Sequence, residues 1–314
     1  MTSASGAARG RLGRGALAVA ALAMAGCQYM PHAYEPQSAQ IPEARTIPVQ
    51  GAFLTFTSVG SGQPVVFVHG NIADLRIWHA QQGPAFKRYQ LVAYSRRYHY
   101  PNAWTGNGTD YTEANNIHDL VSLLRGLNLS HVHLVGQGAG AQLAVEVALA
   151  HPELVRSLVL VEPDMAAAAV QQPDFASLTT ERAQLQQQME MDLRIEEAEK
   201  AARLLFDWAN ASTGAYDALP PPLKGEILDN ASVLGFFLSA PPPSMPCSEL
   251  ARLSVPTLVV TGERTNLFYT AVGESVAGCI PKAVREVIPM ASHVVQRENP
   301  DVFNATVVGF LAVH

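Results

Sequence analysis

The amino-acid sequence predicts an α/β protein, with a mostly parallel sheet covered by helices on both faces. Short apolar runs typical of strands alternate with segments of helical periodicity over residues 51–164, and the alternation resumes over residues 247–314. A glycine-rich turn at residues 136–140 joins one apolar run directly to a helical pattern. Residues 165–246, between the two alternating parts, are helical and irregular, which predicts a helical insertion that forms a cap or lid.

The first alternating part contains predicted strands at residues 52–58, 65–68, 90–94, 132–135 and 157–161. Its predicted helical segments are residues 75–89, interrupted by Gly83 and Pro84, residues 112–126, and the stretch from Ala141 to His151. After the insertion, the sequence predicts strands at residues 256–261 and 283–288 and a last helix at residues 300–313.

The composition is that of a globular protein, since 48% of the residues are hydrophobic and 15% are charged. The formal net charge is −6 at pH 7, and no basic stripe offsets it, which argues against a nucleic-acid partner. The sequence contains no phosphate loop, CxxC pair or HExxH motif. We therefore expect neither a metal nor an organic cofactor.

Residues 1–26 resemble a signal peptide for export. Three arginines precede the apolar residues 15–25, a run shorter than the roughly 20 residues that span a bilayer. The run ends in Met24-Ala25-Gly26-Cys27, which resembles the lipobox of bacterial lipoproteins. The resemblance implies cleavage before Cys27 and a diacylglycerol on its thiol, and the loss of three arginines changes the net charge from −6 to −9. An ordinary secretory signal is the alternative.

Residues 27–50 contain four prolines and no helical period, which predicts an extended tether between the lipid anchor and the domain. Gln28 follows the cysteine, and this favours the outer membrane in a cell that has one. The expected location is the cell envelope, with the membrane as a partner through the lipid. In an exported protein, Cys247 and Cys279 can form a disulfide, and two buried free thiols are the alternative.

The glycine-rich turn has the spacing of a G-x-S-x-G nucleophile elbow, in which a strained strand-to-helix turn exposes a serine. The outer glycines correspond to Gly136 and Gly140, but the central position is Gly138, which has no side chain. A glycine relieves a backbone strain of about 1–3 kcal/mol. It also removes the nucleophile, and no serine of the elbow can replace it, since Ser95, Ser130 and Ser292 all lie in other segments. Ordinary acyl-enzyme catalysis is therefore not expected.

Several motifs resemble the α/β-hydrolase superfamily, lidded bacterial members above all, over about residues 51–314. In chain order they are His69-Gly70-Asn71 after a strand, the elbow, Glu162-Pro163 after a strand, and the loop 288–293 that ends in His293. The resemblance implies an α/β-hydrolase fold with a first core part at residues 51–164, a cap at 165–246 and a second core part at 247–314.

The resemblance assigns the role of general base to His293, which lies in the loop before the last helix. Such a base needs a carboxylate that orients it. The usual position for this acid corresponds to Thr265, which cannot serve, whereas some family members place a glutamate where this chain has Glu162. We assign the orienting role to Glu162, with Glu263 as the alternative. For either glutamate, the non-catalytic interpretation is an ion pair that only stabilises the structure.

An oxyanion hole consists of backbone N–H groups and therefore survives the loss of the serine. By resemblance its donors are the amides of Asn71 and Ala139, and the start of a helix near Ala139 adds its positive end. His69 is expected to pack in its turn rather than to act in catalysis.

Three functions are compatible with this pattern. The first is an enzyme in which His293 and Glu162 act with the oxyanion hole and without a covalent intermediate. The second is a binding protein that holds a small ligand, and the third is an ordinary esterase-like hydrolase inactivated at Gly138. The expected substrate or ligand is small and largely apolar, because the insertion offers Leu204, Phe206, Trp208, Phe236 and Phe237 rather than a basic cluster. Arg96 and Arg97 are interpreted as part of a solvated loop, with the steering of an acidic substrate as the alternative.

Overall fold

An eight-stranded sheet is the centre of the computed structural model, which describes residues 1–2, 43–104, 106–194, 197–239 and 244–314. Residues Pro31–His314 form one compact unit, and of the other unit, Met1–Met30, only the first two residues are described. The strands lie in the order β1-β2-β4-β3-β5-β6-β7-β8. Their bounds are Arg45–Val49 (β1), Ala52–Gly60 (β2), Gln63–Val68 (β3), Tyr89–Tyr94 (β4), Val132–Gln137 (β5), Val155–Val161 (β6), Thr257–Gly262 (β7) and Val284–Ile288 (β8).

The six strands from β4 to β8 in this order are parallel. At one edge β2 pairs antiparallel with β4, and β1 pairs antiparallel with β2. The chain leaves β3 for β4 on one side and then crosses to β5 on the other side. Open parallel sheets bind ligands at the carboxyl ends of the strands beside such a reversal. The topology therefore predicts a site beyond the ends of β3 and β5.

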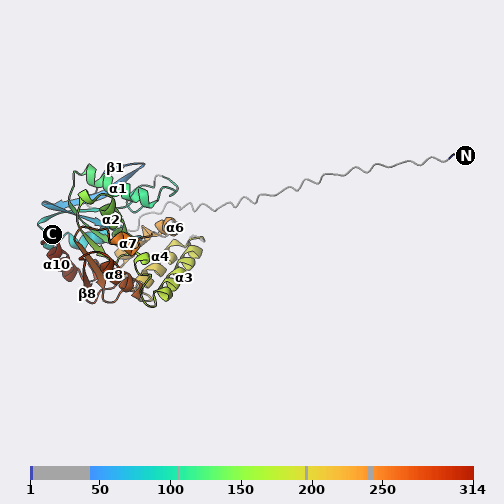
Figure 1. Cartoon of the computed structure of the whole chain (residues 1–314). Helices are drawn as coiled ribbons and strands as arrows, with labels where there is room; N and C mark the ends of the chain where they lie inside the picture. The colour runs from blue at the N-terminus through green and yellow to red at the C-terminus, as the bar shows by residue number, and fades with distance from the viewer. Residues whose placement is uncertain (3–42, 105, 195–196, 240–243) are drawn as a thin grey trace. The chain divides into compact units, whose positions relative to one another are not determined.

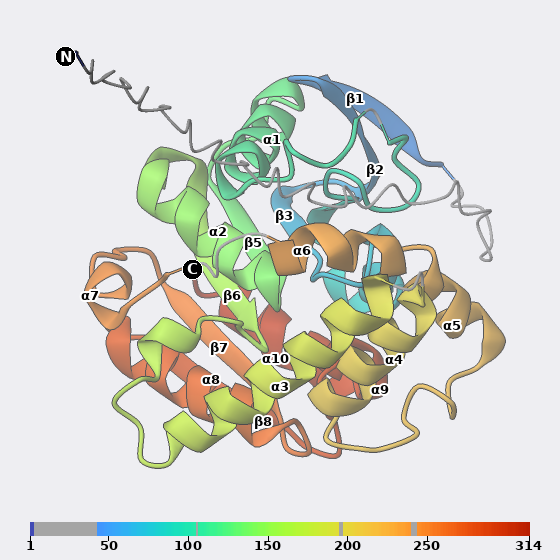
Figure 2. The same ribbon diagram turned by 90° about the vertical axis from the view of Figure 1, so that its right-hand side faces the viewer.

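Helices cover both faces of the sheet, as Figures 1 and 2 show. Alternate residues of β3 point to opposite faces: Val66 and Val68 pack in one apolar cluster and Val65 and Phe67 in another. The first cluster includes residues of α1 (Glu113–Gly126), α2 (Ala139–Ala150) and α8 (Leu267–Cys279). The second includes residues of the 3₁₀ helices η1 (Leu75–Gln81) and η2 (Pro84–Phe86) and of α10 (Pro300–Leu311). This arrangement confirms the predicted fold class.

A helical insertion lies between β6 and β7. It contains α3 (Phe175–Arg194), α4 (Ala198–Ala209), α5 (Pro221–Leu228) and α6 (Leu234–Ser239). Figure 2 shows α3 and α4 side by side. The insertion has an apolar cluster of its own, with Met189, Ala202, Ile227 and Leu234 among its buried members. The insertion is therefore a small packed layer rather than a loose loop.

Shorter helices complete the structure: η3 (Pro152–Leu154), η4 (Ala166–Ala168), η5 (Ala231–Val233), α7 (Cys247–Leu250) and α9 (Val295–Glu298). Cys247 at the start of α7 and Cys279 at the end of α8 form a disulfide, with a Cα–Cα distance of 5.1 Å.

Among the described residues, no helix combines the length and the apolar character that a membrane span requires. The predicted signal peptide and Cys27 lie outside the described residues.

Two sequence predictions about elements are wrong. Residues 45–49, assigned to the tether, form β1, which pairs with β2 and buries Ile47. Pro48 is compatible with this strand because β1 is the edge of the sheet. Residues 75–89 are interrupted at Gly83 and Pro84 as predicted, but the two parts are the short 3₁₀ helices η1 and η2 rather than α-helix, and Tyr89 already belongs to β4.

Candidate active site

The turn after β5 has the backbone of a nucleophile elbow without its nucleophile. Gly138 has φ 57° and ψ −121°, a conformation that residues with a Cβ rarely adopt, and α2 begins at the next residue. A Cβ on Gly136 would lie 2.3 Å from the Gly140 carbonyl oxygen, and a Cβ on Gly140 would lie 2.3 Å from that of Val68. A Cβ on Gly138 would meet only the Cα of Gly70, at 3.9 Å. The outer glycines are therefore sterically required, whereas Gly138 has room for a side chain.

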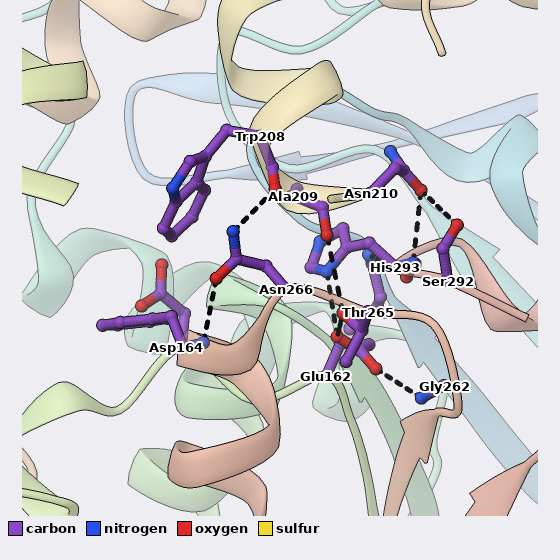
Figure 3. Close-up of polar contacts among 12 residues, drawn as sticks. Glu162, Asp164, Trp208, Ala209, Asn210, Gly262, Thr265, Asn266, Ser292 and His293 are labelled. Carbon is purple, nitrogen blue, oxygen red and sulfur yellow. Dashed lines mark hydrogen bonds and ion pairs between the residues drawn. The ribbon is translucent and has the colours of Figure 1, made fainter. Parts of the chain in front are cut away.

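Glu162 and His293 lie side by side beyond the ends of β6 and β8. His293 Nδ1 is 3.1 Å from Glu162 Oε2, and the Glu162 side chain is completely buried. The same carboxylate accepts 2.6 Å hydrogen bonds from the Gly262 amide and from the Thr265 hydroxyl (Figure 3). Because Nδ1–H donates to the carboxylate, Nε2 carries the lone pair that a general base requires.

Glu162 has φ 48°, in the left-handed region, which is uncommon for a residue with a side chain. Such conformations cost about 1–3 kcal/mol and cluster at functional sites. The alternative acid, Glu263, accepts a 2.8 Å hydrogen bond from the amide of Met290. Of the two candidate acids, Glu162 is thus the one that the structure brings to His293.

The two predicted oxyanion donors lie beyond β3 and β5. The amide of Ala139 is in the first turn of α2, where a helix offers no acceptor for it. The amide of Asn71 donates to no described residue, and the Asn71 carbonyl lies 2.9 Å from His99 Nε2. His69 is buried, accepts a hydrogen bond from the Arg96 amide, and lies with His99 beneath this turn, as expected of a packing residue.

A cavity of about 210 Å³ joins these groups. Asn71, Gly138, Ala139 and His293 contribute to its wall. The rest is mostly apolar and comes largely from the insertion, with Leu205, Phe206, Leu219, Leu223, Ile227 and Phe237. A cavity of about 150 Å³ can hold benzene, so this one suits a small, largely apolar molecule.

Charged residues in the cavity wall are paired with one another. Arg182 of α3 forms a bidentate ion pair with Asp164, with Nη2 2.6 Å from Oδ2. Arg297 of α9 forms an ion pair with Glu226 of α5 at 2.6 Å. The ring of Tyr269, at the start of α8, lies 4.3 Å from that of His293, and burial raises the pKa of its hydroxyl.

The end of α4 holds both loops of the site in place (Figure 3). Asn210 Oδ1 accepts hydrogen bonds from the Ser292 hydroxyl at 2.7 Å and from the His293 amide at 3.2 Å. Asn266, next to Thr265, donates to the Trp208 carbonyl at 3.0 Å. The insertion thus contacts the loop of the base and the loop that supports Glu162.

Two other expectations differ from the structure. Arg96 and Arg97 are buried, not solvated: Arg97 donates to Asp119 at 2.8 Å, and Arg96 donates to Tyr111 at 2.9 Å. Neither arginine lines the cavity. Among the aromatic residues of the insertion, Phe206 and Phe237 line the cavity, whereas Trp208 packs against Phe268 of the core.

Sequence reasoning missed Asp164, Arg182, Asn210 and Tyr269. Asp164 lies three residues after the end of a predicted strand, and polar residues at such strand ends are candidates for a site. Arg182 and Asn210 belong to the insertion, whose sequence does not indicate which side chains reach the core.

Residues 65–306 match the Alpha/beta hydrolase family. The chain belongs to this family. One relative is a Mycobacterium tuberculosis protein named as a non-heme bromoperoxidase, BpoC. It is 33% identical over 109 residues, which span 34% of this chain and 40% of that relative. The 2-(acetamidomethylene)succinate hydrolase of Mesorhizobium japonicum is 24% identical over 274 residues, which span 85% of this chain and 95% of the relative.

Solved structures show the same fold. The enol-lactonase from Burkholderia xenovorans LB400 has a TM-score of 0.69 at 19% identity, with 85% of this chain and all of that chain covered. Est816, described as an N-acyl homoserine lactone degrading enzyme, has a TM-score of 0.69 at 21% identity, with the same coverage.

Proposed function

We propose that this protein is an enzyme that acts on a small, largely apolar carbonyl compound by general base catalysis without a covalent intermediate. The observation that supports the proposal is the Glu162–His293 pair beside an elbow whose central residue is Gly138. A binding protein has no need of an oriented imidazole. In serine hydrolases, loss of the nucleophile lowers the rate by about 10⁶, and the oxyanion hole and binding retain about 10³–10⁴ over water.

In the proposed reaction, a water molecule near Gly138 gives a proton to His293 Nε2 as its oxygen attacks the carbonyl carbon. Glu162 stabilises the imidazolium, and the amides of Asn71 and Ala139 donate to the negative oxygen. The tetrahedral intermediate collapses as His293 returns the proton to the leaving group. Direct removal of a substrate proton by His293 is the variant of this chemistry that needs no water.

Binding without catalysis is the second candidate function, and Gly138 itself favours it, since it carries no reactive atom. The names of one relative and one structural neighbour, a hydrolase and an enol-lactonase, favour hydrolytic chemistry over binding alone. We also propose that the protein is exported and anchored to the cell envelope through Cys27, a proposal that depends on the sequence of residues 1–27 alone.

The test compares wild type, Gly138→Ser, His293→Ala and the double variant Gly138→Ser/His293→Ala on small chromogenic esters. The space around Gly138 allows a serine side chain, and the backbone is already that of an elbow, so we expect Gly138→Ser to gain at least tenfold in ester hydrolysis. We expect His293→Ala to abolish both this gain and any turnover by wild type. Wild-type turnover unaffected by His293→Ala would rule out the base, and a folded but inert Gly138→Ser would favour binding.

A further inference from the structure

Polar side chains of the cavity wall with unused hydrogen-bonding capacity include Tyr269 and Asn71, whose buried Oδ1 has no partner among the described residues. Tyr269 lines the cavity and is only 4% exposed. Its ring lies against that of His293, and its hydroxyl makes no hydrogen bond to a described residue. Burial and the charge of Asp164 raise the pKa of Tyr269, so the hydroxyl keeps its proton and is available as a donor. A buried donor of this kind favours a ligand that supplies an acceptor.

The arginines of the wall do not offer a free positive charge. Arg182 is held by both oxygens of Asp164, and its guanidinium also lies 4.5 Å from the centre of the Phe268 ring. Arg297 donates to Glu226 and to the Arg76 carbonyl, both at 2.6 Å. Each cation is thus already neutralised within the protein.

The remaining charge of the wall is negative. Glu298 is exposed at the cavity and accepts a 2.5 Å hydrogen bond from the Ser292 amide, and its two carboxylate oxygens lie 2.6 and 2.8 Å from the Ser292 hydroxyl oxygen. The described residues of the wall therefore carry three carboxylates and two arginines. A carboxylate ligand that pairs with either arginine would have to displace Asp164 or Glu226 and leave that carboxylate without its partner, which is costly when the groups are partly buried.

We propose that the substrate is a neutral molecule with a second oxygen acceptor, and that the Tyr269 hydroxyl binds this acceptor while the reacting carbonyl lies at the oxyanion hole. Tyr269 thus selects for a bifunctional neutral molecule, and the Asp164–Arg182 and Glu226–Arg297 pairs select against an acid. This inference deepens the proposed function and rests on its assignment of the cavity as the substrate site. The inferred neutral substrate differs from that of the relative whose name describes a succinate derivative, which is an acid.

The test measures binding, so that it does not depend on turnover. Three ketones of similar length are titrated into the full chain at pH 7 by calorimetry: hexane-2,5-dione, 4-oxopentanoate and hexan-2-one. The first has a neutral second acceptor, the second a carboxylate in its place, and the third no second acceptor. We expect hexane-2,5-dione to bind at least tenfold more tightly than 4-oxopentanoate and about fivefold more tightly than hexan-2-one.

Two variants separate the contributions. Tyr269→Phe should weaken hexane-2,5-dione about fivefold and leave hexan-2-one unchanged within twofold. Asp164→Asn removes the partner charge of Arg182 and should tighten 4-oxopentanoate at least tenfold. Equal or tighter binding of 4-oxopentanoate by wild type, no measurable binding of the dione, or equal effects of Tyr269→Phe on both neutral ketones would overturn the inference. If binding follows the expected order but esters are not turned over, only the proposed catalysis fails.

Discussion

At the residue scale, the elbow separates what packing requires from what chemistry requires. Gly136 and Gly140 contact backbone so closely that no Cβ fits, and their identity is explained by the fold alone. Gly138 has a positive φ but open space around its Cα, so the fold does not exclude a serine there. Packing therefore does not account for the absence of a side chain at residue 138.

Thr265 supports the acid of the site from the position at which the acid itself is expected. It occupies the place where the family resemblance leads one to expect an acid, and its hydroxyl instead donates to Glu162 at 2.6 Å. The hydroxyl, together with the Gly262 amide, satisfies a carboxylate that has no access to solvent. A buried charged group requires such partners.

We expect Thr265→Val, which removes the hydroxyl at nearly constant shape, to lower the free energy of unfolding by about 2 kcal/mol, since a hydrogen bond to a buried charged group contributes roughly that amount. Urea unfolding measures it. Thr46→Val, at an exposed position of β1, is the matched control and should stay within about 0.5 kcal/mol of wild type. Equal stability of the two variants would show that Glu162 does not depend on Thr265.

At the element scale, the parallel sheet explains why residues far apart in sequence meet. Asn71, Gly138, Glu162 and His293 follow the ends of β3, β5, β6 and β8, and all these ends lie at one edge of the sheet. Strand ends are visible in the sequence as changes from apolar runs to glycine, proline or polar residues. For this reason the sequence predicts the fold class and the residues of this edge.

Contacts made by the insertion could not be predicted in the same way. Asn210 is one polar residue among many in a helical segment, and only the packing of α4 against the core brings it to Ser292 and His293. Burial of Arg97 likewise depends on Asp110 and Asp119, which are 13 and 22 residues away in sequence. In both cases the position of the side chain depends on contacts with residues distant in sequence, and no local sequence pattern predicts those contacts.

We expect the end of α4 to stabilise the loop that carries the base. Asn210→Leu removes the acceptor of the His293 amide at similar volume, so amide hydrogen exchange in residues 291–294 should become about tenfold faster, equivalent to ~1.4 kcal/mol. The matched control is Asn116→Leu, at a buried asparagine of α1 that accepts from Arg96 instead. Equal acceleration of residues 291–294 by both variants would indicate general destabilisation and contradict a specific contact.

At the scale of the whole molecule, buried ionisable groups make stability depend on pH. Burial lowers the pKa of His99 to about 3 and of His133 to about 4, and it lowers the pKa of His69 well below its ordinary value. Below about pH 6.5, the unfolded chain therefore binds protons on these histidines that the folded chain does not. Their contribution to stability is complete above pH 6.5 and is lost as the pH falls toward 4.

Glu146 of α2 acts in the opposite direction. Burial raises its pKa to about 7, so the folded chain keeps a proton that the unfolded chain releases at its ordinary pKa of about 4.5. Its contribution to stability is complete below about pH 4.5 and is lost as the pH rises through 7. Burial also raises the pKa of Asp119 and of Glu226, which gives these carboxyls the same sign.

The three histidines oppose Glu146, Asp119 and Glu226. We expect the free energy of unfolding to decrease from pH 6.5 to pH 5, by at most about 3 kcal/mol per pH unit, which is the slope for a net difference of two protons when Glu146 alone opposes the histidines. Glu146→Gln removes the opposing proton. It should make the decrease steeper by about 1.4 kcal/mol per unit and should stabilise the protein at pH 8, where the buried carboxyl is ionised. Urea unfolding between pH 5 and 8 measures both effects, with Glu286→Gln, at an exposed position of β8, as the matched control. A flat profile in wild type, or a Glu146→Gln curve parallel to it, would mean that these groups titrate alike in the folded and unfolded chain.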